Sequence, residues 1–410
     1  MATIPGVFNT TGLSATPDYK ALSFSRMITR LMPQGTAPLF ALTSYLKDET
    51  ALQTEHGYFA KSAIFPFATL TAAIAPGDTT VTVASTAMMV PGMVLRVDNA
   101  TGENIQVETV ISGTDMTIRR GIGAAAAPAA AGVNLYSIGT AYEEASLRPL
   151  ALNNQPVRMS NLTQIFRNTW ANSDTVRATQ VIAGDSIVSE SRQDCAALHA
   201  QDIEAALLFS RKATGVRNNQ PVRYMDGLIS MISDIANYPT SYTVPNVWAA
   251  GATTNYTQLE GFLDPCLNQT TDPKSASERV IFTGGAGRRV LNNIGRLNST
   301  YYMENGQTSF GLQFSTIKTS RGTFQVIEHP MLNSNATWAR NAIVVDLASI
   351  NLAYLNGRKT QNKEFNMDGN VAQDNGIDAV GGTLTTELTL LCKNVPANAV
   401  ITNLTAAAVG

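Results

Sequence analysis

The chain has 410 residues, of which 44% are hydrophobic and 15% are charged, and its formal net charge is −2. This length allows two or three compact units with sizeable cores. A net charge near zero excludes a protein that neutralises nucleic-acid phosphates in bulk. We expect no signal peptide, because the N-terminal sequence MATIPGVFNTTG has no basic region and no apolar run. We also expect no membrane span, because no stretch of about 18 apolar residues occurs.

The surface composition points to a crowded environment. Low charge combined with many Thr, Asn, Ala and Gly residues is typical of a surface that neighbouring molecules cover, since a free monomer usually presents more charge to water. The three cysteines, Cys195, Cys266 and Cys392, are odd in number and far apart. Each has small apolar neighbours, which predicts reduced core thiols in a cytosolic setting.

Residues 1–40 are polar and are interrupted repeatedly by Pro and Gly. Such a segment predicts an extended arm that becomes ordered by lying on another surface. Residues 41–65 form a mixed segment that ends in an apolar run. We interpret Gln53–Phe65 and Ala145–Phe166 as two long partner segments, because the composition between them changes abruptly.

Residues 69 to about 142 predict a small all-β module inserted between those partner segments. Apolar and polar residues alternate with period two in four short runs, which indicates strands with one buried face: 80–83, 93–97, 104–107 and 116–119. Gly, Pro, Asn and Asp separate these runs at short intervals. The spacing suits a β-sandwich or a barrel.

The longest predicted helix spans Asp185–Lys212 and would be roughly 40 Å long at 1.5 Å per residue. Asp185 or Ser186 can cap its N-terminus, Arg211 and Lys212 suit its C-terminus, and Gly215 follows as a stop. Helical spacing predicts one apolar face, made of Val188, Cys195, Leu198, Ile203, Ala206 and Phe209. The opposite face is predicted to carry the polar residues Arg192, Asp194, Gln201, Asp202 and Glu204.

The rest of the chain mixes helices and strands without regular βαβ alternation. Shorter helices are predicted at 225–235 and 256–267, and another begins at 290–294. Strands are predicted at 279–282, 322–329, 342–346, 350–355, 383–391 and 399–404. This order predicts an α+β fold.

Few residues suggest a catalytic or metal-binding site. His199 and Asp202 stand at i,i+3 on the long helix, a spacing that can hold a metal, but no second ligand pair is near in sequence. Glu190 and Asp194 could form a carboxylate pair, although a plain polar stripe explains them as well. His329, before Pro330, is most simply a strand end. We therefore predict no catalytic residue, no cofactor and no metal.

The Gly-rich stretch Gly284–Arg289 follows a predicted strand and precedes a helix, which is the setting of an anion site at a helix N-terminus. It lacks the lysine and hydroxyl of GxxxxGK[ST] and does not match GxGxxG. A Gly-rich strand–helix turn is the simpler interpretation. The basic pairs Arg119-Arg120 and Arg288-Arg289 are typical of surface or intersubunit ion pairs.

Several short motifs resemble one family. These are Asn161–Phe166 (NLTQIF), the long helix that follows Gly184, and a C-terminal stretch containing Thr386–Leu390 and Ile401–Leu404. Together they resemble the major capsid proteins of tailed bacteriophages. More narrowly, Val90–Leu95 and Arg120-Gly121 are similar to the signature of a β-rich insertion carried by some members.

The resemblance implies a Hong Kong 97-like fold with a long spine helix. Its parts would be an arm (1–40), an extended β-hairpin loop (41–65 and 142–180), an inserted β domain (66–141), a peripheral domain with the spine helix (181–223 and 341–410) and an axial domain (224–340). It also implies self-assembly into hexamers and pentamers of an icosahedral head. The implied partners are copies of the chain, enclosed double-stranded DNA without sequence-specific binding, and portal, scaffolding and decoration proteins. Assembly would occur in the host cytoplasm.

Two other classes of function remain open at this point. The inserted β module could be the head of a glycan- or surface-binding protein, although its aromatic supply is thin, with Tyr136 and Tyr142. An enzyme could use Gly284–Arg289 to bind a nucleotide. A shell protein needs neither aromatic platforms nor catalytic groups.

Overall fold

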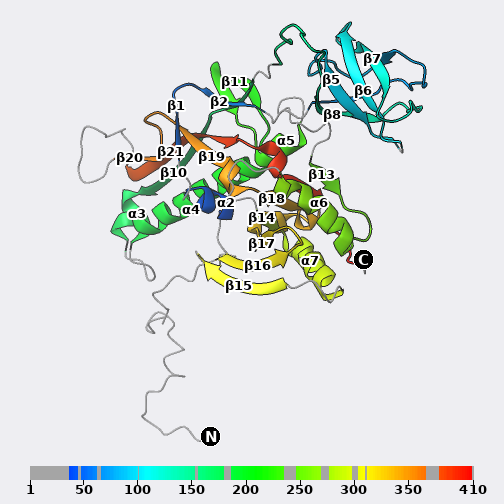
Figure 1. Cartoon of the computed structure of the whole chain (residues 1–410). Helices are drawn as coiled ribbons and strands as arrows, with labels where there is room; N and C mark the ends of the chain where they lie inside the picture. The colour runs from blue at the N-terminus through cyan, green and yellow to red at the C-terminus, as the bar shows by residue number, and fades with distance from the viewer. Residues whose placement is uncertain are drawn as a thin grey trace, which may run out of the picture. The chain divides into compact units, whose positions relative to one another are not determined.

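The computed structural model divides the chain into two compact units (Figure 1). One unit is Phe59–Arg158, and the other combines Met1–Tyr58 with Met159–Gly410. The structure describes residues 37–44, 48–61, 66–99, 101–152, 156–179, 186–234, 246–268, 277–297, 303–309, 312–365 and 378–408. The predicted arm at 1–40 therefore lies outside the described residues, except for its last four positions.

A five-stranded sheet is organised around the 14-residue strand β21, which pairs with three other strands. Its strands are β1 (Glu49–Ala51), β10 (Gln164–Ser173), β19 (Ile350–Leu355), β20 (Gln361–Phe365) and β21 (Ala379–Cys392). The β10–β21 pairing is antiparallel from Gln164–Leu388 to Ser173–Ala379. A small core of Trp170, Cys195 and Val380 fixes the long helix on this sheet.

A seven-stranded mixed sheet runs in the order β13-β22-β18-β14-β17-β16-β15. Its strands are β13 (Val247–Ala249), β14 (Glu278–Thr283), β15 (Met303–Ser309), β16 (Leu312–Lys318), β17 (Thr323–Glu328), β18 (Ala342–Val345) and β22 (Ala399–Thr402). Central strands β14 and β18 are buried almost throughout, so both faces of the sheet are covered.

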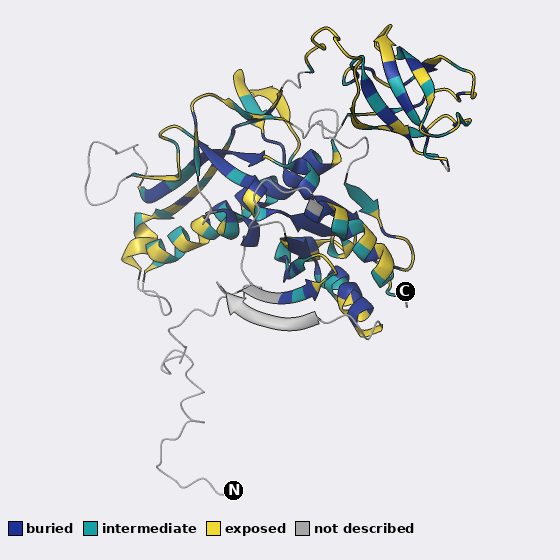
Figure 2. Ribbon diagram, viewed as in Figure 1, coloured by how far each residue is buried: buried dark blue, intermediate teal, exposed yellow. Residues whose placement is uncertain are grey.

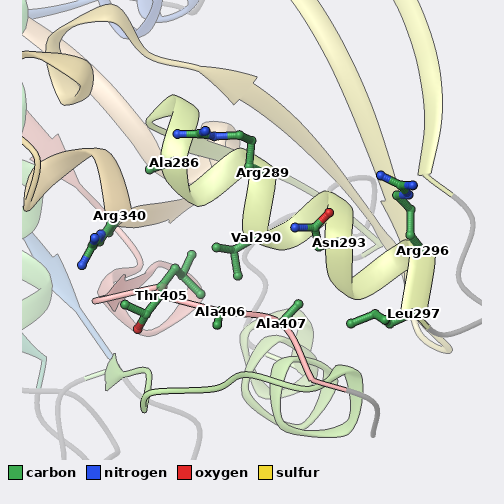
Figure 3. A pocket seen from close by; sticks show the side chains of 11 residues that line it. Ala286, Arg289, Val290, Asn293, Arg296, Leu297, Arg340, Thr405, Ala406 and Ala407 are labelled. Atoms are coloured by element: carbon green, nitrogen blue, oxygen red, sulfur yellow. The ribbon is translucent and has the colours of Figure 1, made fainter.

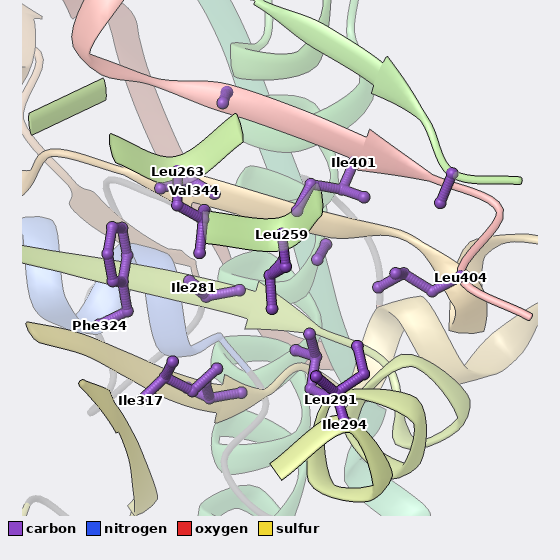
Figure 4. Close-up of a cluster of buried hydrophobic side chains, with 14 of the residues drawn as sticks. Leu259, Leu263, Ile281, Leu291, Ile294, Ile317, Phe324, Val344, Ile401 and Leu404 are labelled. Carbon is purple, nitrogen blue, oxygen red and sulfur yellow. The ribbon is translucent and has the colours of Figure 1, made fainter. Parts of the chain in front are cut away.

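Helices α6 (Tyr256–Asn268) and α7 (Gly285–Leu297) share one core with this sheet. Figure 4 shows Leu259 and Leu263 of α6 and Leu291 and Ile294 of α7 gathered over strand side chains such as Ile281. Because side chains alternate along a strand, Ile281 enters this core, whereas its neighbours lie on the opposite face.

The long helix α4 spans Ile187–Phe209, so it is 23 residues and roughly 34 Å long. The predicted bounds of 185–212 were too wide at the C-terminal end. Gly215 does not end the helix, because the backbone is already extended at Ser210. Ser186 is the N-cap but makes no side-chain capping bond, and Asp185 lies outside the described residues.

The smaller elements complete this unit. They are α2 (Pro38–Ser44), α3 (Asp174–Ala178), α5 (Leu228–Ser233), the β2–β9 pair (Glu55–Ala60 and Val157–Leu162) and the β11–β12 hairpin (Ala213–Arg217 and Gln220–Tyr224). The hairpin was not predicted, and the helix predicted at 225–235 is only α5. Asn218 and Asn219 both have positive φ, which is the geometry of a tight hairpin turn.

The unit Phe59–Arg158 holds a closed six-stranded β-barrel. Its strands are β3 (Phe67–Thr69), β4 (Thr80–Thr82), β5 (Met93–Val97), β6 (Asn104–Val110), β7 (Asp115–Ile122) and β8 (Asn134–Thr140). The order β3-β8-β5-β6-β7-β4 is closed by a bridge between Leu70 and Val83. The predicted strands are confirmed, and their inward residues form one core.

Burial follows the sheets and leaves several loops exposed (Figure 2). Within the described ranges, no helix combines the length and the apolar composition that a membrane span requires. The α+β class predicted from the sequence is confirmed by the mixture of helices and sheets.

Candidate functional site

Glu204 of α4 is a fully buried carboxylate that joins three parts of the chain. One of its oxygens accepts a hydrogen bond from the Leu39 N–H and the other from the Phe40 N–H, each at 2.7 Å. These donors belong to the first turn of α2, where unpaired N–H groups attract a negative charge. Figure 1 shows α2 lying against α4.

The third partner is His329, whose Nε2 lies 2.6 Å from Glu204 Oε1, and this side chain is also fully buried. Its Nδ1 accepts from the Met331 N–H, so the ring proton is on Nε2, which donates to Glu204. His329 is therefore more than a strand end, and Glu204 is not on an exposed polar face. We call Glu204, His329 and the first turn of α2 the Glu204 junction.

The NLTQIF motif builds a second polar junction where β9 meets β10. Asn161 donates to the carbonyls of Asp226 and Leu390 and accepts from the Asp226 N–H at 2.7 Å. Gln164 accepts from the Met225 N–H at 3.0 Å. These side chains satisfy backbone groups of neighbouring segments, so the motif holds strands and loops together rather than contacting a ligand.

Glu387 of β21 occupies the centre of this second junction. It accepts from Thr163 at 2.9 Å and pairs with Arg223 at 3.0 Å and with Arg358 at 2.8 Å. Glu387 is buried, while the two arginines reach toward the surface. One buried carboxylate thus connects four segments, through hydrogen bonds from Thr163 and Arg223 and an ion pair with Arg358.

His199 and Asp202 both hydrogen-bond to Asn168. His199 Nδ1 lies 2.6 Å from Asn168 Oδ1, its Nε2 lies 2.8 Å from the Thr386 hydroxyl, and Asp202 accepts from Asn168 at 2.7 Å. Burial lowers the pKa of His199, against a smaller opposing effect of the Asp202 charge. Among the described residues, no group of three or more His, Cys, Asp or Glu side chains could hold a metal.

In the barrel, the predicted signature residue Arg120 binds the buried Glu103 at 2.6 Å. Glu103 also accepts from the backbone N–H groups of Gly121 and Ala127, at 3.0 and 3.1 Å. Burial alone would raise the pKa of Glu103, but the Arg120 and backbone hydrogen bonds outweigh it and lower that pKa. Gly121 has a φ of +73°, a backbone conformation that residues with a side chain adopt only with strain.

Gly284–Arg289 is a closely packed helix start. Helix α7 begins at Gly285, earlier than the predicted 290, and the Gly285 N–H is bound by Asn333 Oδ1 at 2.6 Å. A Cβ on Gly284 would stand 2.5 Å from Ala339 Cα, so the glycine permits close packing. Arg288 pairs with Glu328 at 3.4 Å.

The three cysteines are buried and free, as predicted. Burial raises the pKa of Cys392 to about 12, so its thiol stays protonated and unreactive near neutral pH.

The comparisons with known proteins identify the chain's relatives. A family model described as SU10 major capsid protein matches residues 7–405. The chain belongs to the SU10 major capsid protein family. A curated major capsid protein of Pseudomonas phage PaMx41 is 34% identical over 413 residues, covering 98% of this chain and 97% of that protein.

Solved structures similar to this capsid protein have low sequence identity. The capsid of a native GTA particle is 9% identical, with a TM-score of 0.49 and coverage of 98% of this chain and 100% of that chain. A chain from Mycobacterium phage Cain is 8% identical, with a TM-score of 0.47 and coverage of 98% and 99%. None of these matches supports the glycan-binding alternative.

As a major capsid protein of a phage, the chain is a structural component of the virion. The residues described above fit that role, because Glu204, Glu387 and Glu103 each join separate segments of the chain.

Proposed function

We propose that copies of this chain assemble into hexamers and pentamers that form an icosahedral head around double-stranded DNA. The observation that carries this proposal is the family match, which spans nearly the whole chain from residue 7 to residue 405. Two further features support it. The net charge of −2 suits a container that holds DNA without gripping every phosphate. Large apolar side chains, such as Leu52, Leu147 and Val216, are more than 70% exposed in the single chain.

We propose that the segments of the chain correspond to the parts of a Hong Kong 97-like fold. Residues 1–40 would act as the arm, 41–65 with 142–180 as the extended loop, and 66–141 as the inserted domain. Residues 181–223 with 341–410 would form the peripheral domain around the long helix, and 224–340 the axial domain. The seven-stranded sheet with α6 and α7 supports an axial role for 224–340, because most of its strands fall there.

The Glu204 junction supports an arm that begins at a fixed point. It binds Leu39 and Phe40 in the first turn of α2, which are the last residues of the segment proposed as the arm. An arm anchored in this way could reach a neighbouring copy while its root stays in place. Portal, scaffolding and decoration proteins, and assembly in the host cytoplasm, belong to the same proposal.

Negative-stain electron microscopy of the chain expressed alone, and then with its genomic neighbours, tests the proposal. We expect hollow shells, tubes or capsomer rings. A field of uniform small particles under every salt and crowding condition would contradict assembly. Sedimentation at increasing protein concentration gives an independent check, since subunits that assemble by mass action must sediment faster as concentration rises.

A further inference from the structure

A basic cavity of about 760 Å³ lies between α7 and the segment that follows β22. Arg289 and Arg296 come from α7, and Arg340 lies across from them, beside Thr405–Ala407 (Figure 3). Arg288 of the same helix pairs with Glu328. By contrast, none of the three cavity arginines forms an ion pair with a carboxylate of the described residues. The cavity therefore presents three positive charges that lack a negative partner within this part of the chain.

The walls of this cavity are fixed by the fold, and part of its lining is apolar. The Leu404 N–H donates to the Arg340 carbonyl at 2.9 Å, and the Ala408 N–H donates to the Thr254 carbonyl at 2.8 Å. Leu404 is fully buried, whereas Leu297 at the cavity is 46% exposed. A matching ligand should therefore combine negative charge with an apolar side chain, which a phosphate backbone does not offer.

The chain itself contains a segment with these properties, at residues 141–150. All ten residues are exposed, and none belongs to a helix or strand. Glu143 and Glu144 lie in a turn in which the Ser146 N–H donates to the Glu143 carbonyl at 3.2 Å. Leu147, three residues further on, is 92% exposed. This segment therefore offers two carboxylates and exposed apolar side chains to a partner, with Leu150 also 71% exposed.

We propose that residues 143–147 of one copy bind the basic cavity of a second copy. Glu143 and Glu144 would pair with Arg296 and Arg340 through charge-assisted hydrogen bonds, and Leu147 would cover Leu297. The contact joins two different surfaces, so repeating it from copy to copy produces a ring if the rotation closes. This inference rests on the proposed shell function and names one contact that would build the shell.

Intermolecular disulfide formation tests the contact directly in full-length chains. One chain carries Glu144→Cys and the other carries Arg296→Cys, and the native thiols are buried. After mixing, assembly and mild oxidation, we expect a covalent dimer of two 43.8 kDa chains that needs both variants. The matched control replaces Glu144→Cys with Asp98→Cys, another exposed acidic position in the same unit, and should give no such dimer.

Charge reversal provides the second test. We expect Arg296→Glu with Arg340→Glu to raise the concentration needed for assembly about tenfold or more, equivalent to about 1.4 kcal/mol. Adding Glu143→Arg and Glu144→Arg should restore assembly, which a misfolded chain could not do. If the wild type forms shells but no dimer appears and the arginine variant assembles normally, the contact is rejected and the shell function stands. That outcome is also expected if nucleic acid fills the cavity. If the wild type forms no shell at all, the proposed function itself fails.

Discussion

At the scale of single residues, a few buried carboxylates accept hydrogen bonds from separate segments of the chain and so connect them. Glu204 is fully buried and is held by two backbone N–H groups and one imidazole. Removing one partner leaves a buried polar or charged group unsatisfied. The free-energy cost of that unsatisfied group exceeds the net stabilisation that the complete set of hydrogen bonds provides. The position of α2 therefore depends on one side chain from a distant helix.

We expect Glu204→Gln to lower the free energy of unfolding by about 3 kcal/mol. The amide offers one acceptor oxygen, and its NH₂ group would face a backbone donor. Urea denaturation measures the loss, and limited proteolysis should show faster cleavage around residues 37–44. The control is Gln193→Glu on the exposed part of α4, which should change stability by less than about 0.5 kcal/mol. Equal effects of the two variants would contradict the importance of the Glu204 junction.

His199 gives a pH-dependent prediction. Its pKa in the folded chain is lowered, mainly by burial, relative to about 6.5 in the unfolded chain. As the pH falls through about 6.5, the unfolded chain binds a proton that the folded chain does not, so stability decreases. We expect His199→Gln to make urea stability less dependent on pH between 5 and 8. An unchanged pH profile in this variant would show that His199 does not contribute.

At the scale of elements, strands were easier to predict than polar contacts. Alternation along β5, where Met93, Leu95 and Val97 point inward, is visible in the sequence. Helical spacing located α4 but misassigned its faces, because Leu198 is 55% exposed and Glu204 is buried. The reason is that the partner of Glu204 stands 125 residues away, and local periodicity carries no information about it.

The candidate site was predictable only in part. The motif residues Asn161 and Arg120 were recognised by resemblance, but their partners Asp226 and Glu103 were not, because these pairs form through tertiary packing. The β11–β12 hairpin had a local signal, the adjacent Asn218 and Asn219, which favour the positive φ of a tight turn. The basic cavity had none, since Arg296 and Arg340 line one cavity only in the folded chain.

The barrel depends on the pair of Glu103 and Arg120. We expect Glu103→Gln to destabilise the barrel by about 3 kcal/mol and to leave the other unit unaffected. Because the pKa of Glu103 is lowered, its contribution is present above the unfolded value near 4.3 and is lost as the pH falls below it. Calorimetry should then separate two transitions. Glu108→Gln, on the exposed side of β6, serves as the control. Its calorimetric unfolding profile should match that of the wild type.

The start of α7 depends on close backbone packing. We expect Gly284→Ala to destabilise the chain by about 1–3 kcal/mol, because the new Cβ would stand 2.5 Å from Ala339 Cα. Gly261→Ala in α6 has open space around its new Cβ and should stabilise the helix by about 0.5–1 kcal/mol. Chemical denaturation of both variants measures the difference. Two changes of the same sign would show that the crowding at Gly284 is relieved by a backbone shift.

At the scale of the whole molecule, the exposed segment at 141–150 should report on assembly. A protease specific for Glu should cut free subunits after Glu143 or Glu144, because both residues are exposed outside regular structure. We expect cleavage in assembled shells to be much slower, and gel electrophoresis of the two fractions measures the ratio. Cleavage at the same rate in shells and subunits would place this segment on a free surface. Cleavage elsewhere in the chain gives an internal reference.

The junction between the two units has a consequence for engineering. The chain leaves the larger unit after Tyr58 and returns at Met159, and the Tyr58 hydroxyl lies 3.1 Å from the Met159 sulfur. The two ends of the barrel unit are therefore already side by side, in paired strands β2 and β9. A foreign domain whose own termini are close together could replace the barrel without stretching either strand. The capsid subunit thus contains a natural grafting point, at which each copy in a particle could display the same cargo.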